Sequence, residues 1–104
     1  MSVREQAEKF GAWAWPSSDY AHWSARASLR QAAGALETFP DAQWYPIGLI
    51  VERMAEDGWT WEISDGWARF SCSFRDITRE ADAETTLEAV LSAALAAVGE
   101  QDDG

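Results

Sequence analysis

The sequence predicts an α+β fold in which helices pack against a small antiparallel sheet. Two patterns predict it: apolar and polar residues alternate over residues 59–74, as in a β-hairpin, and apolar stripes at helical spacing lie on both sides of this stretch. The length of 104 residues suits one domain, and an apolar content of 47% is enough to form a core despite the net charge of -10. We therefore expect a single domain over residues 1–104, with long N-terminal and C-terminal helices.

The first helix is expected from residue 3 to about residue 10. Ser2 and Glu5 have the spacing of a capping box, and Gly11 is a suitable stop at the C-terminal end. Residues 13–16, which include Trp15, then predict a short irregular or extended link.

Two further helices are expected before the hairpin. The second covers about residues 20–37, because Asp19 is a good N-cap residue and an apolar stripe follows it at helical spacing. The third has Pro46 in its first turn and ends at Gly58, where glycine favours a helix stop. Its apolar face consists of Ile47, Ile50, Val51 and Met54.

The hairpin joins strands at residues 59–64 and 67–74 through Asp65 and Gly66, a favoured two-residue turn. This turn pairs Ser64 with Trp67, and the same register places Trp61 opposite Phe70. All pairs on that face are then apolar, whereas the other face pairs Glu62 with Arg69. A slip by one residue would destroy both patterns, so the register is strongly specified.

Residues 75–83 are polar and predict a loop, with a continued or third strand near Ile77 as the alternative. Thr85 and Glu88 have capping-box spacing for a final helix that ends at Gly99, and residues 99–104 are expected to be a loose acidic tail. We expect the apolar stripe of this helix to pack against Trp59, Trp61, Ile63 and Phe70; its members are Leu87, Val90, Leu91, Ala94, Leu95 and Val98.

Two strands alone are marginally stable, so the predicted hairpin needs a further strand. Either a third strand joins it, for instance through residues 10–15, or a second subunit completes the sheet in a homodimer.

Three segments of the chain resemble the phage ABA sandwich domain family. They are AEKFG at residues 7–11 followed by Trp13, IVERMAEDGW at residues 50–59, and AETT at residues 83–86 leading to AALAA at residues 93–97. The segments follow the order of the family and span most of the chain, except residues 17–38. The resemblance implies a layered fold and a phage or prophage origin. The family has no agreed activity, so the resemblance implies no catalytic residue.

Composition and motifs argue against several classes of function. The net charge of -10 opposes direct binding to nucleic acids or to anionic membranes, and the longest apolar run is too short for a membrane span. The N-terminus lacks a secretory signal, so we expect a location in the cytoplasm of a bacterial host cell. His22 is the only histidine and Cys72 the only cysteine. We therefore expect no metal, no cofactor and no enzyme activity.

The acidic residues are concentrated late in the chain. Residues 76–104 contain eight acidic residues and one basic residue, Arg79, whereas residues 1–36 are nearly neutral. Such asymmetry indicates a partner-binding surface, for which the first choice is Asp76, Glu80, Asp82, Glu84 and Glu88 and the second choice is Glu52, Glu56 and Asp57. Trp67, which falls on the polar face of the hairpin, and Trp44 are the expected aromatic anchors.

These observations predict a non-catalytic acidic protein of a phage or prophage. It would bind and inhibit a basic, nucleic-acid-binding host protein or nucleoprotein complex, with an acidic surface that mimics nucleic acid. By analogy, anti-CRISPR proteins are similar in size and charge. The alternative is a structural or assembly module of a phage that dimerises through the edge of its sheet. In that case the negative charge would serve solubility only.

Overall fold

The computed structural model describes the backbone of residues 2–102 and the side chains of residues 2–99. This part of the chain has an α+β fold with four α-helices, one short 3-10 helix and one three-stranded sheet. In chain order the elements are α1 (Val3–Ala14), α2 (Tyr20–Gly34), η1 (Pro40–Gln43), α3 (Trp44–Glu56), β1 (Thr60–Ser64), β2 (Trp67–Cys72), β3 (Ile77–Asp82) and α4 (Thr86–Asp102).

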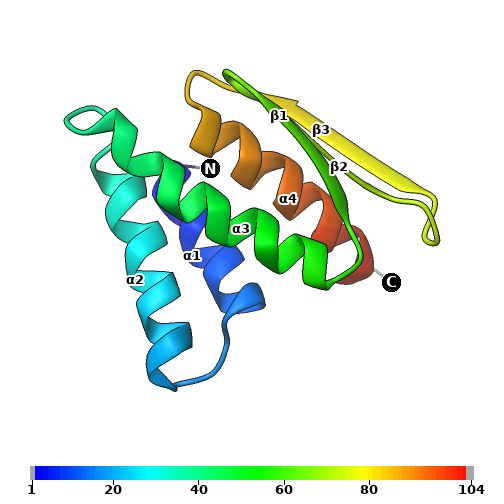
Figure 1. Ribbon diagram of the computed structural model, residues 1–104, viewed down its shortest axis with the longest axis horizontal. Coiled ribbons are helices and arrows are strands. Elements are labelled where there is room, and N and C mark those ends of the chain that lie inside the picture. The colour runs from blue at the N-terminus through cyan, green and yellow to red at the C-terminus, as the bar shows by residue number, and fades with distance from the viewer. Residues whose placement is uncertain (1, 103–104) are drawn as a thin grey trace.

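The elements are arranged in layers (Figure 1). The antiparallel sheet has the order β1-β2-β3, and α4 packs along one face of it. On its other side α4 contacts α1 and α3, and α2 packs against α1 and α3 farther from the sheet. The second face of the sheet is open, because the side chains that point from it are exposed or half-buried.

The hairpin forms in the predicted register. Ser64 pairs with Trp67, Trp61 with Phe70, and Glu62 with Arg69. The second strand is shorter than expected because the chain turns after Cys72, which leaves Phe74 73% exposed in the turn.

A third strand completes the sheet within the chain. Residues 77–82 form β3, which pairs with β2, so the prediction of a loop over residues 75–83 was wrong and the alternative strand near Ile77 is confirmed. The suggested third strand through residues 10–15 was also wrong, because α1 includes residues 10–14.

Helix α1 continues through Gly11 instead of ending there. The glycine is buried, and a Cβ atom at this position would lie 3.2 Å from Cγ of Arg26 on α2. Gly11 therefore allows α1 and α2 to approach closely, and it remains within the helix. At the other end the predicted cap is confirmed, since the Ser2 side chain accepts a hydrogen bond from the backbone N–H of Glu5.

The N-terminus of α2 is capped by Asp19, as predicted. The Asp19 carboxylate accepts the backbone N–H of His22 and the hydroxyl of Ser17, and these two hydrogen bonds hold the pKa of Asp19 below its ordinary value. The helix ends at Gly34, earlier than the expected residue 37.

The third helix begins two residues before Pro46, at Trp44, and the short helix η1 leads into it. Pro46 is still in the first turn. Backbone N–H groups there have no acceptor within the helix, so the missing N–H of proline costs no hydrogen bond. The helix ends at Glu56, shortly before Gly58, whose φ of +94° lies in the region that favours glycine.

The final helix extends past its predicted end at Gly99. Residues 99–102 belong to α4, so the expected loose tail was wrong there, and residues 103–104 lie outside the described residues. One glycine lowers helix stability by only about 1 kcal/mol relative to alanine, which is too little to end a long helix.

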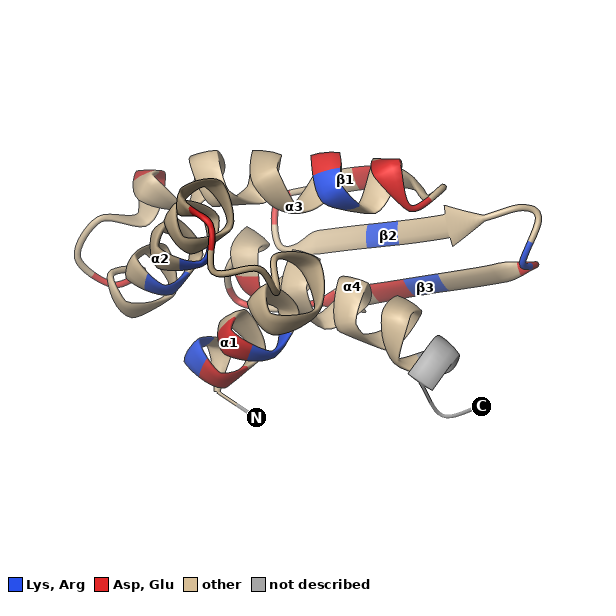
Figure 2. Cartoon of the chain, turned by 90° about the horizontal axis from the view of Figure 1, so that it is seen from below, with Lys and Arg blue, Asp and Glu red and all other residues tan. Residues whose placement is uncertain are grey.

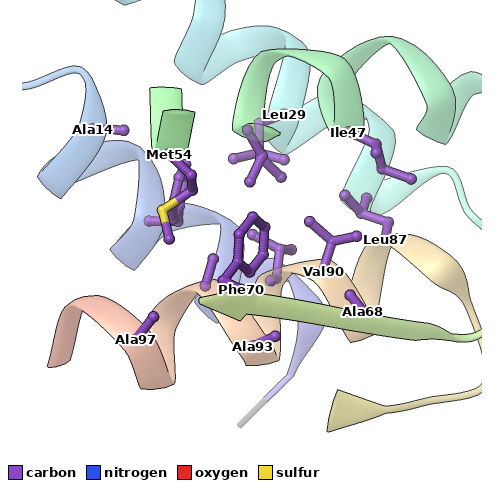
Figure 3. Close-up of a cluster of buried hydrophobic side chains, with 14 of the residues drawn as sticks. Ala14, Leu29, Ile47, Met54, Ala68, Phe70, Leu87, Val90, Ala93 and Ala97 are labelled. Carbon is purple, nitrogen blue, oxygen red and sulfur yellow. The ribbon is translucent and has the colours of Figure 1, made fainter. Parts of the chain in front are cut away.

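Helix α4 supplies a large part of the core. Five members of its predicted stripe are buried, namely Leu87, Val90, Leu91, Ala94 and Val98, whereas Leu95 is half-buried. Three alanines on another side of the helix are fully buried as well: Ala89, Ala93 and Ala97. Figure 3 shows Phe70 of β2 pointing into this core between Leu29, Met54 and Val90.

The partners expected for this stripe on the sheet are only partly buried. Trp59 and Phe70 are buried and Ile63 is half-buried, but Trp61 is 48% exposed. Trp61 lies on β1, which is an edge strand, so no neighbouring strand covers its outer side. The expectation that Trp61 belongs to the core was therefore wrong.

We predict that Leu91→Ala lowers the free energy of unfolding by about 2–5 kcal/mol, because it leaves a cavity at a fully buried position. Leu95→Ala is the matched control on the same helix and should lower it less, since Leu95 is half-buried. Urea unfolding followed by circular dichroism measures both values. Equal losses in the two variants would contradict the assignment of Leu91 to the core.

Candidate functional site

The open face of the sheet brings together side chains from all three strands. Its residues form three rows across the strands: Ser64, Trp67 and Asp82; Glu62, Arg69 and Glu80; and Thr60, Ser71 and Thr78. We call these nine residues the open face. These residues share one face because successive side chains of a strand point to opposite faces of the sheet, and the intervening residues point toward α4.

Negative charge exceeds positive charge on the open face. Three carboxylates, those of Glu62, Glu80 and Asp82, accompany one guanidinium, that of Arg69. Arg69 forms a salt bridge with Glu62, and Glu80 is its neighbour on the other side. Because Arg69 and Glu62 are both partly exposed, this ion pair adds little to stability.

Trp67 lies beside the carboxylates. It is the direct cross-strand neighbour of Asp82, and its ring centroid is 5.6 Å from the guanidinium carbon of Arg69. The side chain is half-buried, so part of the ring is available to a partner. The open face therefore combines an aromatic side chain with an excess of carboxylates, which is an arrangement that suits protein binding.

The first-choice acidic residues lie in three places. Glu80 and Asp82 are on the open face, whereas Glu84 and Glu88 lie around the N-terminal end of α4, in the preceding connection and in the first turn respectively. Asp76 is in the turn between β2 and β3, at the opposite end of β3 from Glu84. Figure 2 shows acidic positions on β3 and at the C-terminal end of α3. The structure thus groups Glu80, Asp82 and Glu84 and separates Asp76 from them.

The second-choice acidic residues lie at the C-terminal end of α3. Glu52 and Glu56 are exposed, but Asp57 has a structural role. Its Oδ2 atom is 3.1 Å from Nη1 of Arg75 and accepts a hydrogen bond from Nε1 of Trp59. This ion pair connects the end of α3 to the turn between β2 and β3.

Trp44 lies near the N-terminal end of α4 and not on the open face. The preceding residue, Gln43, is buried, and its Oε1 atom accepts the backbone N–H of Leu87 at 2.9 Å. Trp44 itself is 51% exposed. Sequence reasoning did not identify Gln43, because 44 positions separate it from Leu87 and no local pattern marks such a contact.

The turn of the hairpin is fixed to the same end of α4. The backbone N–H of Gly66 donates to Oγ1 of Thr86 at 3.1 Å, and the carbonyl of Gly66 accepts the N–H of Ala83. Asp65, in this turn, therefore adds another carboxylate near those of Asp82 and Glu84. Neither Asp65 nor Glu62 was predicted from the sequence as a partner-binding residue, although strand alternation already placed Glu62 on the polar face of the hairpin.

His22 and Cys72, the two other side chains with reactive groups that the sequence analysis considered, have structural roles. Nδ1 of His22 accepts the backbone N–H of Ser17, and Cys72 is buried in the core. Among residues 2–99 no group of three or more His, Cys, Asp or Glu side chains is placed to hold a metal ion. None of the helices in the described part of the chain is long and apolar enough to cross a membrane.

Comparison of the chain with known protein families, curated proteins and solved structures finds no match. The resemblance to the phage ABA sandwich domain family therefore stays a prediction.

We predict that Gln43→Ala lowers the free energy of unfolding by about 1–3 kcal/mol, because it leaves the buried N–H of Leu87 without its acceptor. Gln31→Ala, at an exposed position of α2, is the control and should change it by no more than about 0.5 kcal/mol. Thermal or urea unfolding tests both. An unchanged stability of Gln43→Ala would show that the hydrogen bond does not fix η1 to α4.

Proposed function

We propose that the chain is a non-catalytic acidic protein that binds and inhibits a basic, nucleic-acid-binding protein or nucleoprotein complex. The observation that supports this most is the position of Trp67 beside Asp82 on an open face that also carries Glu62 and Glu80. The carboxylates would attract a site rich in arginine and lysine, and the tryptophan would supply apolar contact area.

The proposed mechanism is competition for a phosphate-binding site. Non-specific binding of nucleic acid depends mostly on lysine and arginine side chains that neutralise the phosphates. The same side chains would bind a carboxylate-rich surface, because carboxylates are also negatively charged. Glu80 and Asp82 are alternate residues of one strand, so they form a short row of negative charge with a spacing of about 7 Å. In the phage or prophage setting that we propose, the target would be a protein of the bacterial host.

A second candidate function is assembly through the edge of the sheet, with the charge serving solubility. It is favoured by Trp61, which is 48% exposed on the edge strand β1. An exposed edge strand has unpaired backbone groups that can pair with another chain. Sedimentation at micromolar concentration separates the two functions, because inhibition by the open face does not require a dimer.

We predict that reversing Glu80, Asp82 and Glu84 together to lysine slows association with the basic partner by about tenfold or more, since charge complementarity acts mainly on the association rate. The partner is captured from a bacterial lysate on the immobilised wild-type chain and purified. A biosensor then measures its rates at low and at physiological salt. Wild-type association should weaken as salt rises, and stability should hardly change because all three residues are exposed.

A comparison variant reverses Glu8, Glu52 and Glu56 to lysine; it changes the net charge equally at exposed positions on α1 and α3 and also tests the second-choice residues Glu52 and Glu56. Its effect should be much smaller, because charges farther apart than a Debye length are largely screened. If the triple reversal on the sheet leaves association and nucleic-acid displacement unchanged, the proposed function is wrong. If both triple variants slow association equally, total charge matters and the open face does not.

We predict that Trp67→Ala raises the dissociation rate of the same partner by about tenfold or more with little change in association, because the buried aromatic contact is lost after docking. Trp23→Ala is the control, since Trp23 is 54% exposed on α2, away from the sheet. The same biosensor measures both variants. An effect on association alone would contradict the role of Trp67 as an anchor.

A further inference from the structure

A hollow lies between α1 and α4, which pack against each other (Figure 2). Its volume of about 500 Å³ is within the usual range for sites that bind small molecules. We call it the α1–α4 hollow, and the residues that line it include Gln6, Lys9, Trp13, Ser92, Leu95 and Gly99. All the described residues that line it belong to α1 or α4, so it is separate from the open face of the sheet and independent of the proposed function.

One part of the α1–α4 hollow is apolar and aromatic. Trp13 of α1 and Leu95 of α4 line it, and both side chains are half-buried. Leu95 is the one member of the apolar stripe of α4 that is not buried, because it borders this hollow. The centroid of the Trp13 ring is 5.7 Å from that of the buried Phe10 and 4.6 Å from the guanidinium carbon of Arg53. These two neighbours hold the ring in place, so the hollow has a preorganised aromatic wall.

A polar pair lies in the same hollow. Nε2 of Gln6 donates a hydrogen bond of 2.8 Å to Oγ of Ser92, and both side chains are half-buried. Ser92 is the only polar residue within residues 89–98, so this apolar stretch of α4 places its one hydroxyl at the hollow. Oε1 of Gln6 is buried and has no hydrogen-bond partner among the described residues. A partly satisfied polar pair stabilises a fold less than apolar side chains would, which favours a role in binding.

The charge at the α1–α4 hollow is positive. Lys9 is exposed and lines the hollow, whereas no aspartate or glutamate among the described residues does so. Lys9 forms no ion pair within residues 2–99. The nearby carboxylates are directed elsewhere, since Glu5 accepts a hydrogen bond from Ser2 and Glu8 lines a hollow toward α2. In a chain with a net charge of -10, this hollow therefore suits a ligand that carries a negative charge.

We propose that the α1–α4 hollow binds a small molecule with an aromatic ring and one carboxylate. The carboxylate accepts hydrogen bonds from Nζ of Lys9 and from the hydroxyl of Ser92, whose oxygen accepts from Gln6 and whose hydrogen stays available for donation. The ring lies beside Trp13 and Leu95, where it is removed from water. The lining thus matches both parts of such a molecule, a few polar groups for the anion and apolar side chains for the ring.

The test uses phenylbutyrate, which joins an aromatic ring to a carboxylate through a short flexible chain. Three control molecules each change one part: the neutral amide removes the charge, the corresponding amine reverses it, and butyrate lacks the ring. Each is titrated into the full-length chain while backbone amide and tryptophan indole signals are followed by NMR. We expect saturable shifts at residues 6–13 and 92–99 with a dissociation constant of about 1 mM or lower for phenylbutyrate, and binding about tenfold weaker for each control.

A substitution that fills the hollow locates the ligand. Gly99 lines the hollow, and a Cβ atom there would have nothing of the described fold within 4 Å, so Gly99→Leu adds a side chain without a clash. It should weaken phenylbutyrate binding about tenfold or more. Gly48→Leu on α3 is the matched control, because a Cβ atom at Gly48 also has open space around it and Gly48 does not line the hollow. It should leave the affinity unchanged, and both variants replace a glycine within a helix by a better helix former.

A second substitution tests the charge. Lys9→Gln should remove the preference for phenylbutyrate over its amide, because the cation that binds the carboxylate is lost. Arg30→Gln removes one positive charge at an exposed position of α2 that does not line the hollow, and it should keep the preference. The NMR spectrum of each variant shows whether the fold is kept, and Lys9→Gln decides the outcome if Gly99→Leu unfolds.

Each contrary result has a definite meaning. Absence of shifts at residues 6–13 and 92–99 with about 10 mM phenylbutyrate, or equal binding of the amide or the amine, overturns the proposal. Unchanged binding to a folded Gly99→Leu variant places the ligand elsewhere and overturns it as well. Shifts at the same residues that appear when the protein concentration alone is raised would identify a second copy of the chain as the occupant and would also overturn it.

Discussion

Burial of α4 on two sides is the constraint on which the rest of the structure depends. The sheet lies along one side of this helix, and α1 and α3 lie along another, so the sheet and these two helices are all positioned by contact with it. Leucine and valine fill the larger spaces, whereas Ala89, Ala93 and Ala97 recur every fourth residue and form a second buried stripe. A helix that is apolar on most of its circumference is stable only inside such a sandwich.

The sequence predicted those elements whose pattern is local and failed where a residue serves a distant contact. The hairpin register was predictable because one register alone makes a whole face apolar, and the turn at Asp65 and Gly66 fixes the same register. The sequence indicated a helix stop at Gly11. The reason for the glycine is the close approach of Arg26, which lies on another helix and leaves no local pattern in the sequence. Strand β3 was hidden because Arg79 interrupts the apolar residues on its inward side.

The candidate site was predictable to a similar degree. Strand alternation already placed Trp67 on the polar face, and the structure adds Glu80 and Asp82 to that face by pairing β3 with β2. That pairing also separates Asp76 from Glu84, which sequence proximity had grouped. The role of Asp57 depends on Arg75, 18 residues later, and no charge count could distinguish this paired carboxylate from the exposed ones.

The burial of α4 also determines where the candidate surface lies. Because α4 covers one face of a three-stranded sheet, the other face has only solvent to meet, and polar or charged residues occupy most of it. Helix α2 is two layers away and packs on α1 and α3, so it takes no part in the open face. The open face offers mainly charge, which governs the rate of encounter, and Trp67 offers the apolar contact, which governs the lifetime of a complex. The pairing of β3 with β2 thus places the excess of carboxylates and an aromatic side chain on the same face, the one that α4 does not cover.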